Sequence, residues 1–210
     1  KMPTLIKVLA LGGVLAAASQ VITIAATPAT TPSSGAKTVT AIFAGGCFWC
    51  SESDFEKVPG VIEVESGYTA GNKDNPSYQE VSAGVTGHTE AVRVTYDPQK
   101  VSYPQLVEYF WRTIDPTVKD SQFCDHGTQY RSGIYWQNDI ERKVAEASRD
   151  ALAKSGRIKT IHTELAAAST FWPAEGYHQD YYKKNPVRYH IYRASCGRDA
   201  RLEQLWGKRH

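Results

Sequence analysis

The chain places an apolar, β-branched run directly before a glycine pair and a helix. Thr38–Ala44 reads TVTAIFA, which is typical of a buried strand. Gly45 and Gly46 follow and favour a tight turn. The stretch from Cys47 to Lys57 then has the composition of a helix, which Pro59-Gly60 ends. The folded part of the chain is therefore expected to begin with a strand–turn–helix unit.

Residue patterns predict a further series of strands and helices. Strands are expected at 61–68, 88–96, 134–136 and 161–165, and helices at 103–114 and 139–154. A polar loop is expected from Thr69 to Ser77 and a long loop from Asp115 to Tyr130, and a loop of that length is usually functional. The order β-α-β-β-α-β-α-β, without an internal repeat, predicts an α+β fold. We expect a two-layer sandwich with a mainly antiparallel mixed sheet and a ferredoxin-like, split βαβ core.

Residues 1–26 have the pattern of a secretory signal peptide. A short basic start precedes the apolar run Val8–Ala18 and small residues, with cleavage expected after Ala18 or Ala26. The alternative is an uncleaved membrane anchor, because residues 8–26 have about the length of a membrane span. Residues 27–37 are rich in Thr, Pro and Ser and are expected to form a linker. We therefore expect a periplasmic or secreted protein in an oxidising compartment.

The charge balance gives the chain no electrostatic reason to bind nucleic acid. Its formal net charge is +2, and Lys1 and Lys7 lie in the expected signal peptide, so the remainder is neutral. Hydrophobic residues make up 41% of the chain, which is enough for a sizeable core. Nucleic acid and anionic membrane surfaces are therefore excluded as partners.

Cys47 occupies a position that suits a reactive sulfur. It begins the expected helix directly after a strand, where unpaired backbone N–H groups and the helix dipole stabilise a thiolate. The alternative is an inert, buried pair of cysteines formed with Cys50. Phe48 and Trp49 lie between them. These rings are either ordinary core aromatics or the wall of a pocket for a small, thioether-like group.

Other kinds of cysteine chemistry fit less well. A metal site needs a second CxxC or a histidine pair at ligand spacing, which Cys124-Asp125-His126 and Cys196 do not supply. A papain-like protease has an aromatic residue after the second cysteine of its signature, whereas Ser51 follows Cys50 here. A CxxC thiol–disulfide oxidoreductase is the main alternative to the function described next. A non-catalytic peptide-binding domain with a structural cysteine bridge is a further one.

Five motifs, in a fixed order, resemble the A-type peptide methionine sulfoxide reductases. They read GGCFWC, GYTAGN, SYQEVSAGVTGHTEAVRVTYDP, DHGTQYRSGIYW and AEGYHQDYY, and they extend from about Thr38 to about Tyr182. The resemblance implies an enzyme that reduces methionine S-sulfoxide, free or in proteins, to methionine. It also implies a catalytic domain at 38–185 and a C-terminal tail at 186–210, which carries Cys196.

The resemblance implies roles for individual residues. Cys47 matches the nucleophile that becomes a sulfenic acid, and Phe48 and Trp49 match the residues that hold the substrate methyl group. Glu90 matches the carboxyl group that protonates the sulfoxide oxygen, a task that suits a partly buried glutamate with a raised pKa. Three more polar residues match positions near the same oxygen, namely Tyr78, Tyr130 and Asp125.

The sequence offers two candidates for the cysteine that resolves the sulfenic acid. The family usually carries it in a flexible, glycine-rich tail, whereas this tail lacks such a run and Cys196 lies beyond the expected position. Cys50 lies three residues after Cys47 and can share a helix face with it. We expect Cys50 to act first, with Cys196 as its rival or as a second relay. Cys124 is expected to be a structural bystander, or else a third member of the relay.

The resemblance also implies the partners of the enzyme. The sequence has no metal, flavin or nucleotide motif, so no bound cofactor is expected. An external dithiol, either thioredoxin or a thioredoxin-like periplasmic protein, is expected to reduce the oxidised enzyme. We expect a monomer that acts on oxidised proteins and on free methionine S-sulfoxide. His178 and Gln179 are expected to support the scaffold or contact the peptide, and His126 to be a surface histidine.

Overall fold

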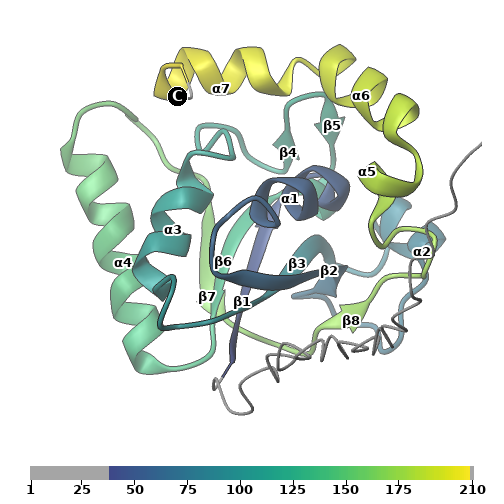
Figure 1. The fold of residues 1–210 in the computed structure, drawn as a ribbon, viewed down its shortest axis with the longest axis horizontal. Helices are drawn as coiled ribbons and strands as arrows, with labels where there is room; N and C mark the ends of the chain where they lie inside the picture. The colour runs from purple at the N-terminus through teal and green to yellow at the C-terminus, as the bar shows by residue number, and fades with distance from the viewer. Residues whose placement is uncertain (1–37, 209–210) are drawn as a thin grey trace, which may run out of the picture. The chain divides into compact units, whose positions relative to one another are not determined.

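The computed structural model describes residues 38–208, which form a mixed sheet with helices packed against it (Figure 1). The predicted signal peptide and linker fall at residues 1–37 and lie outside the described residues. Within residues 38–208, no helix has the length and apolar character needed to cross a bilayer.

The predicted elements are all present and in the predicted order, with further short elements between them. The strands are β1 (Val39–Gly45), β2 (Val61–Thr69), β3 (Thr89–Tyr96), β4 (Ser121–Gln122), β5 (Asp125–His126), β6 (Ser132–Trp136), β7 (Glu164–Ala167) and β8 (Trp172–Pro173). The helices are α1 (Phe48–Phe55), α2 (Tyr78–Ser82), α3 (Tyr103–Trp111), the 3-10 helix η1 (Thr128–Tyr130), α4 (Asp139–Lys154), α5 (Tyr181–Lys184), α6 (Pro186–Ser195) and α7 (Arg198–Trp206). The sequence missed α2, β8, α5, α6 and α7, and the predicted long loop contains β4, β5 and η1.

The sheet has the strand order β7-β6-β1-β3-β2-β8. β3 lies between β1 and β2 and is antiparallel to both, so β1 and β2 run parallel with one strand inserted between them. β6 pairs antiparallel with the other edge of β1, and β7 pairs parallel with β6. The order β6-β1-β3-β2 is that of a ferredoxin-like, split βαβ core, which confirms the predicted α+β fold class.

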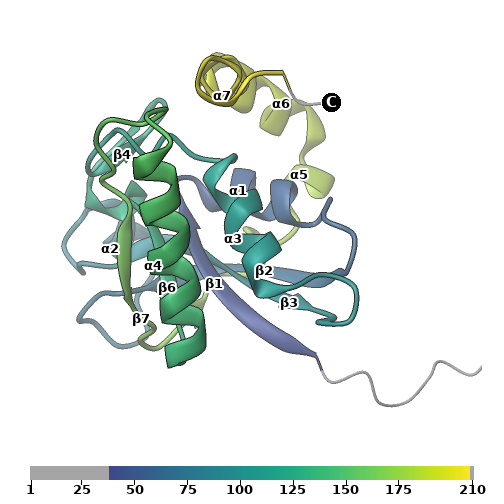
Figure 2. The same ribbon diagram turned by 90° about the vertical axis from the view of Figure 1, so that its left-hand side faces the viewer.

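Successive side chains of β1 point to opposite faces of the sheet, which shows what packs against each face. Phe43 points to the face that α1 and α3 cover, where its ring stacks on Phe55 and Phe110 with centroids 4.9 and 5.1 Å away. Ile42 points to the opposite face and packs with Tyr135 in a smaller cluster. Figure 2 shows α1 and α3 together on one side of the strands. The larger core therefore lies between this helical layer and the sheet, and α1 brings the cysteine pair to its edge.

The C-terminal residues form helices instead of the expected tail. α6 and α7 follow α5 and lie above α1 in Figures 1 and 2. Tyr189 of α6 is buried in a cluster with Cys47 and Cys50. Arg198 of α7 is 2% exposed and donates hydrogen bonds to the carbonyl of Gly45 at 3.2 Å and to another core carbonyl. Residue 185 is therefore not a boundary of the fold, because buried side chains on both sides of it hold one compact unit together.

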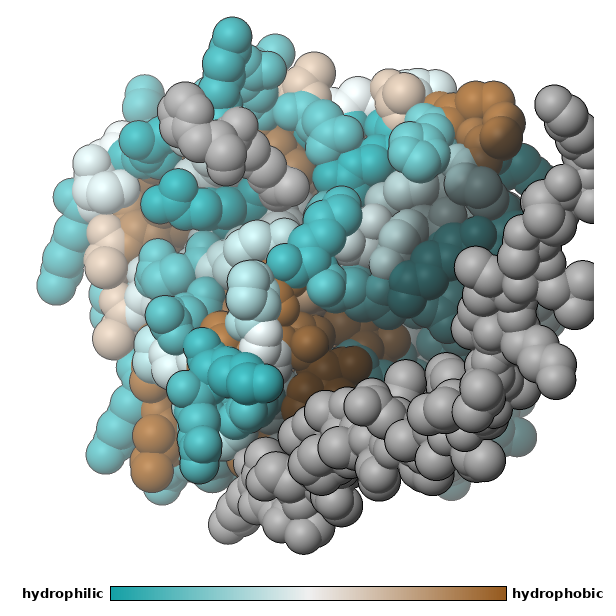
Figure 3. Space-filling view, viewed as in Figure 1, coloured by the Kyte–Doolittle hydropathy of each residue, from teal (hydrophilic) through white to brown (hydrophobic). Residues whose placement is uncertain are grey.

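The face seen in Figure 3 is largely hydrophilic, with an apolar group of side chains over α6. Val187 and Ile191, one helical turn apart on α6, are 71% and 64% exposed. The other side of the same helix holds the buried Tyr189 and Arg193. α6 thus contributes both to the core near the cysteine pair and to the surface.

Candidate active site

The turn between β1 and α1 places Cys47 directly before the first residue of the helix. Gly46 has φ +78°, and a Cβ there would lie 2.5 Å from the Cβ of Gln122, so only glycine fits without displacement. Cys47 is the N-cap residue of α1, and its side chain is 7% exposed. The sulfur is thus nearly enclosed while remaining at the edge of the core.

A cavity of about 80 Å³ opens at this sulfur. Its lining is Cys47, Phe48, Trp49, Tyr78, Glu90, Asp125, Tyr130 and Tyr192. The first seven are the residues that the sequence predicted as nucleophile, pocket wall and polar contacts, and the structure brings all of them together. Tyr192, which α6 contributes, was not predicted. Larger hollows elsewhere on the described surface contain none of these residues.

Glu90 lies in β3 beneath the start of α1. Its side chain is 3% exposed, and Oε2 accepts a hydrogen bond from the backbone N–H of Phe48 at 2.9 Å. Burial raises the pKa of Glu90 to about 8, although the hydrogen bond from Phe48 opposes this shift. Glu90 is therefore mostly protonated at neutral pH and holds a proton inside the cavity.

Three other polar residues surround the cavity from separate elements. Tyr78 begins α2, where its backbone N–H donates to Glu175 at 2.8 Å, and Tyr130 ends η1. Burial and the Glu90 charge raise the pKa of both tyrosines, so both hydroxyls keep their protons. Asp125 lies in β5, and burial raises its pKa while a hydrogen bond from Tyr192 opposes the shift. The cavity thus combines protonated hydroxyls with two carboxyl groups.

Trp49 is fixed by aromatic and polar contacts. Its ring stacks on Tyr181 with centroids 3.7 Å apart and planes 6° from parallel. Its indole N–H donates to Nδ1 of His178 at 3.0 Å. Burial lowers the pKa of His178, which favours the neutral ring that this acceptor role requires. The side-chain amide of Gln179 bonds to both backbone groups of Ser66. These contacts agree with the scaffold roles expected for His178 and Gln179.

Cys47 and Cys50 are unoxidised and hydrogen-bonded to each other. Burial and Cys50 raise the pKa of Cys47 well above its ordinary value. The hydrogen bond from Cys47, followed by the charges of Arg198 and Arg193, lowers the pKa of Cys50 to about 7. The sequence placed the thiolate on Cys47, at the helix N-terminus. In the structure burial outweighs that effect, and Cys50 is the more acidic thiol.

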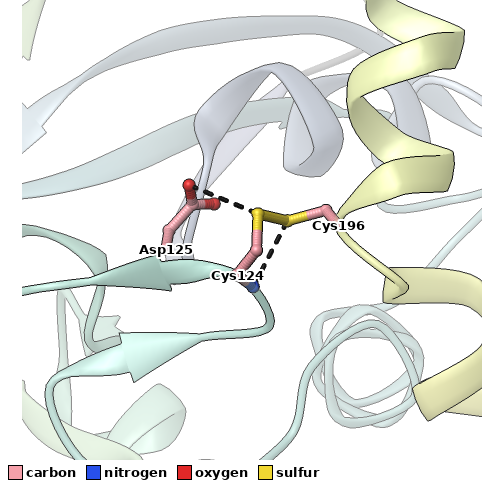
Figure 4. A group of neighbouring side chains, drawn as sticks. All are labelled: Cys124, Asp125 and Cys196. Atoms are coloured by element: carbon pink, nitrogen blue, oxygen red, sulfur yellow. Dashed lines mark hydrogen bonds between the residues drawn. A yellow bond between two sulfur atoms is a disulfide. The ribbon is translucent and has the colours of Figure 1, made fainter.

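The other two cysteines form a disulfide between distant parts of the chain. Cys124, just before β5, is bonded to Cys196 at the end of α6, with their Cα atoms 4.9 Å apart (Figure 4). The sequence did not predict that Cys124 and Cys196 pair with each other, which happens because the fold of α6 brings Cys196 back to Cys124. Cys124 is exposed, so this bond lies at the surface beside Asp125. His126, on the other side of Asp125, is exposed as expected.

Acidic side chains also gather away from the cavity. Glu52, Glu56 and Asp180 present carboxylate oxygens close to one another. Lys183 pairs with Glu56 at 2.6 Å and with Asp180 at 2.8 Å, and Glu52 accepts hydrogen bonds from Ser66 and the backbone of Asp180. Because these oxygens already have protein partners, the group serves to attach α5 to α1.

Comparisons with known proteins agree with this geometry. The family model described as peptide methionine sulfoxide reductase matches residues 39–210. A peptide methionine sulfoxide reductase of Caulobacter vibrioides is 51% identical over 180 residues, which cover 85% of this chain and 91% of that relative. One from Bacillus licheniformis is 50% identical over 171 residues, which cover 81% of this chain and 94% of the relative.

Solved structures give the same result. The crystal structure of Mxr1 from Saccharomyces cerevisiae in reduced form matches with a TM-score of 0.67 and 35% identity, covering 72% of this chain and 88% of that one. Methionine sulfoxide reductase A of Corynebacterium diphtheriae matches with a TM-score of 0.64 and 35% identity, covering 75% of this chain and 78% of that one. Sequence and fold therefore agree over most of the described residues.

Proposed function

The chain belongs to the peptide methionine sulfoxide reductase family, and we propose that the Cys47 cavity is where it reduces methionine S-sulfoxide. The observation that carries this assignment is the protonated Glu90 beside the cysteine. A sulfoxide oxygen cannot leave sulfur unless it gains protons, and Glu90, with a pKa of about 8, has one to give at neutral pH. The hydroxyls of Tyr78 and Tyr130 supply hydrogen bonds to the same oxygen.

The first step converts the Cys47 thiol into a sulfenic acid. The substrate methyl group lies against Phe48 and Trp49, and this brings the sulfoxide sulfur to Cys47. The sulfur of Cys47 bonds to the sulfoxide sulfur while Glu90 protonates the oxygen. The hydroxyl then moves to Cys47 as the S–O bond and the bond between the two sulfurs break, which releases the thioether. The proton lost by the Cys47 thiol makes up for the one that Glu90 gave, so that thiol and sulfoxide become sulfenic acid and methionine.

Cys50 then resolves the sulfenic acid. It is buried one helical turn from Cys47, and the charges of Arg198 and Arg193, which do not depend on the oxidation state of Cys47, lower its pKa and favour the thiolate that attacks. Attack on the Cys47 sulfur forms the Cys47–Cys50 disulfide and, with one proton, expels water. Cys196 is bonded to Cys124 in the structure and would first have to be reduced. Mapping the new disulfide by mass spectrometry after one turnover tests this order, and a bond from Cys47 to Cys196 would contradict it.

We further propose a thioredoxin-like protein as the reductant and export as the fate of the chain. A CxxC disulfide is the usual target of such a dithiol, and residues 1–26 have the signal-peptide pattern. Turnover supported by a purified thioredoxin system in place of dithiothreitol tests the reductant. The N-terminal mass of the protein in a periplasmic extract tests export, and an intact N-terminus in the membrane fraction would favour the anchor.

The decisive experiment compares the two epimers of methionine sulfoxide. With dithiothreitol, we expect consumption of the S epimer only, and no consumption by Cys47→Ser. Reduction of insulin disulfides serves as the control, because a thiol–disulfide oxidoreductase would perform it without needing Glu90. The proposal would be overturned if the protein consumed both epimers equally. It would also be overturned if neither epimer were consumed while insulin reduction persisted in Glu90→Gln.

A further inference from the structure

Tyr192 connects the nucleophile to a carboxylate. Its hydroxyl donates a hydrogen bond to Oδ2 of Asp125. Tyr192 and Cys47 line the same small cavity, and the Tyr192 hydroxyl favours the thiolate form of Cys47 by lowering its pKa against the effect of burial. The Tyr192 ring meets Trp49 edge-on, with centroids 5.9 Å apart and planes at 82°. The hydroxyl therefore stands between the reacting sulfur and Asp125, and its single proton has two acceptors. Residues from α1, β5 and α6 are joined in this way inside one cavity.

We propose that Tyr192 relays the proton of the Cys47 thiol to Asp125. The thiol proton leaves its hydrogen bond with Cys50 and moves to the Tyr192 oxygen as the hydroxyl proton moves to Oδ2 of Asp125. Cys47 becomes a thiolate, Asp125 becomes neutral, and Tyr192 ends as a hydroxyl that now donates to the thiolate. The total charge does not change, and no water or external base takes part. The inference rests on the proposed role of Cys47 as nucleophile.

The two carboxyl groups of the cavity then have different tasks. Glu90 already holds a proton, which it keeps for the sulfoxide oxygen, so it is a poor base for Cys47. Asp125 has charged neighbours that favour its ionised form, because Arg198 and His126 lower its pKa against the effect of burial. Other titratable or charged groups interact electrostatically with the three members of the relay. They are Cys50, Glu90, Tyr78, Tyr130, His126 and Arg198.

The disulfide holds the relay in place. Cys196 follows Tyr192 by one turn of α6, and its backbone N–H bonds to the Tyr192 carbonyl at 2.9 Å. Cys124 immediately precedes Asp125. The Cys124–Cys196 bond, which Figure 4 shows beside Asp125, therefore ties the turn of α6 that carries Tyr192 to the strand that carries Asp125. This gives the bond a positioning role that does not require its reduction during the cycle.

The pH dependence of Cys47 alkylation tests the relay. Iodoacetamide is applied without reductant or sulfoxide, and fragment-ion mass spectrometry reads modification at Cys47 separately from Cys50. Because the relay forms the thiolate without releasing a proton, the wild-type rate should rise in two steps. The first step follows ionisation of Asp125 and the second follows ordinary ionisation of Cys47. Tyr192→Phe and Asp125→Asn should each remove the first step and slow alkylation at pH 7 by about tenfold or more.

The matched control is Tyr182→Phe. It removes a hydroxyl that also bonds to a carboxylate, that of Glu56, in the neighbouring helix α5 and away from the cavity. This variant should keep both steps. Tyr192→Phe combined with Asp125→Asn should be no slower than either alone, because both break one relay. The inference would be overturned by any of three results. The alkylation rate could rise in a single step in the wild type, it could still rise in two steps in Tyr192→Phe, or the two substitutions could slow alkylation by factors that multiply in the double variant. The assay uses no sulfoxide, so its result is independent of whether the proposed substrate is correct.

Discussion

Glu90 shows how one buried side chain sets the chemistry of the site. A carboxyl group in water ionises near pH 4, whereas burial in β3 moves the pKa of this one to about 8. The fold thus keeps neutral a group that would be charged on the surface. The backbone N–H of Phe48 orients it, so the proton lies beside the residue that follows the nucleophile.

Glu90→Gln should therefore change both catalysis and the pH dependence of stability. Single-turnover reduction of the S epimer should fall by about 10²- to 10⁴-fold, because the amide gives up no proton. Native Glu90 binds a proton between pH 4.5 and 8 that the unfolded chain releases, so the wild type loses stability as pH rises through that window. The Gln variant lacks this contribution. Urea unfolding at pH 5 and pH 9 measures the difference.

The control is Glu63→Gln, in which an exposed glutamate of β2 is changed. Its unfolding should respond to pH as that of the wild type does. If the Glu90 variant lost the same stability between pH 5 and pH 9 as the wild type, the raised pKa of Glu90 would be ruled out.

At this scale the sequence predicted the polar residues of the cavity but not Tyr192. Cys47, Glu90 and Asp125 lie in motifs whose order and chemistry are visible in the chain. Tyr192 lies in the run RYHIYRAS, where nothing local separates it from a surface tyrosine. It reaches Asp125 only because α6 folds back over α1, which is a long-range effect of packing.

Elements with strong periodicity were predicted well. β1, α3 and α4 bury regular apolar stripes or alternate between two faces, and their observed bounds lie within three residues of the expected ones. α7 is rich in charged residues, and both α6 and α7 were interpreted as a tail. Their attachment comes from the buried guanidinium groups of Arg193 and Arg198, which hydropathy counts as surface groups.

The bond between β5 and α6 should contribute measurably to stability. It closes a loop between residues 72 apart, so Cys124→Ala should lower the free energy of unfolding by about 2–4 kcal/mol. Cys196→Ala and the double variant should show the same loss within error, since each removes the one bond. Urea unfolding without reductant measures it. Equal stability of wild type and variants would contradict a bond that constrains the unfolded chain.

At the scale of the whole molecule, the C-terminal helices complete the core that the sheet begins. Asp54 of α1 is fully buried, with Arg193 at 3.1 Å and Arg198 at 3.8 Å, one from each C-terminal helix. Arg198 also bonds to the carbonyl of Gly45 in the turn before Cys47. The ferredoxin-like sheet was predictable from the order of the strands. The buried ion pairs of Asp54 were not, because ion pairs between distant segments leave no periodic pattern in the sequence.

A chain that stops after Asn185 should therefore fail to fold cooperatively. It would leave the buried carboxylate of Asp54 without either arginine, and a single broken buried pair already costs about 3–5 kcal/mol. We expect a broad thermal transition and loss of activity. The matched control stops after Gly207, which removes residues 208–210 but keeps the bond from Trp206 to the Ile114 carbonyl. A sharp transition in the shorter chain at the full-length midpoint would refute this dependence.

The Cys124–Cys196 bond also determines what a protease can release from this protein. It encloses β6, α4 and β7, together with the exposed turn at Ser155–Arg157 that follows α4. A cut in that turn breaks the backbone, yet both fragments stay covalently joined. The nicked molecule would migrate as one species on a non-reducing gel and separate into two on reduction. In an oxidising compartment, cleavage at this exposed turn would therefore leave the active-site residues on one connected molecule.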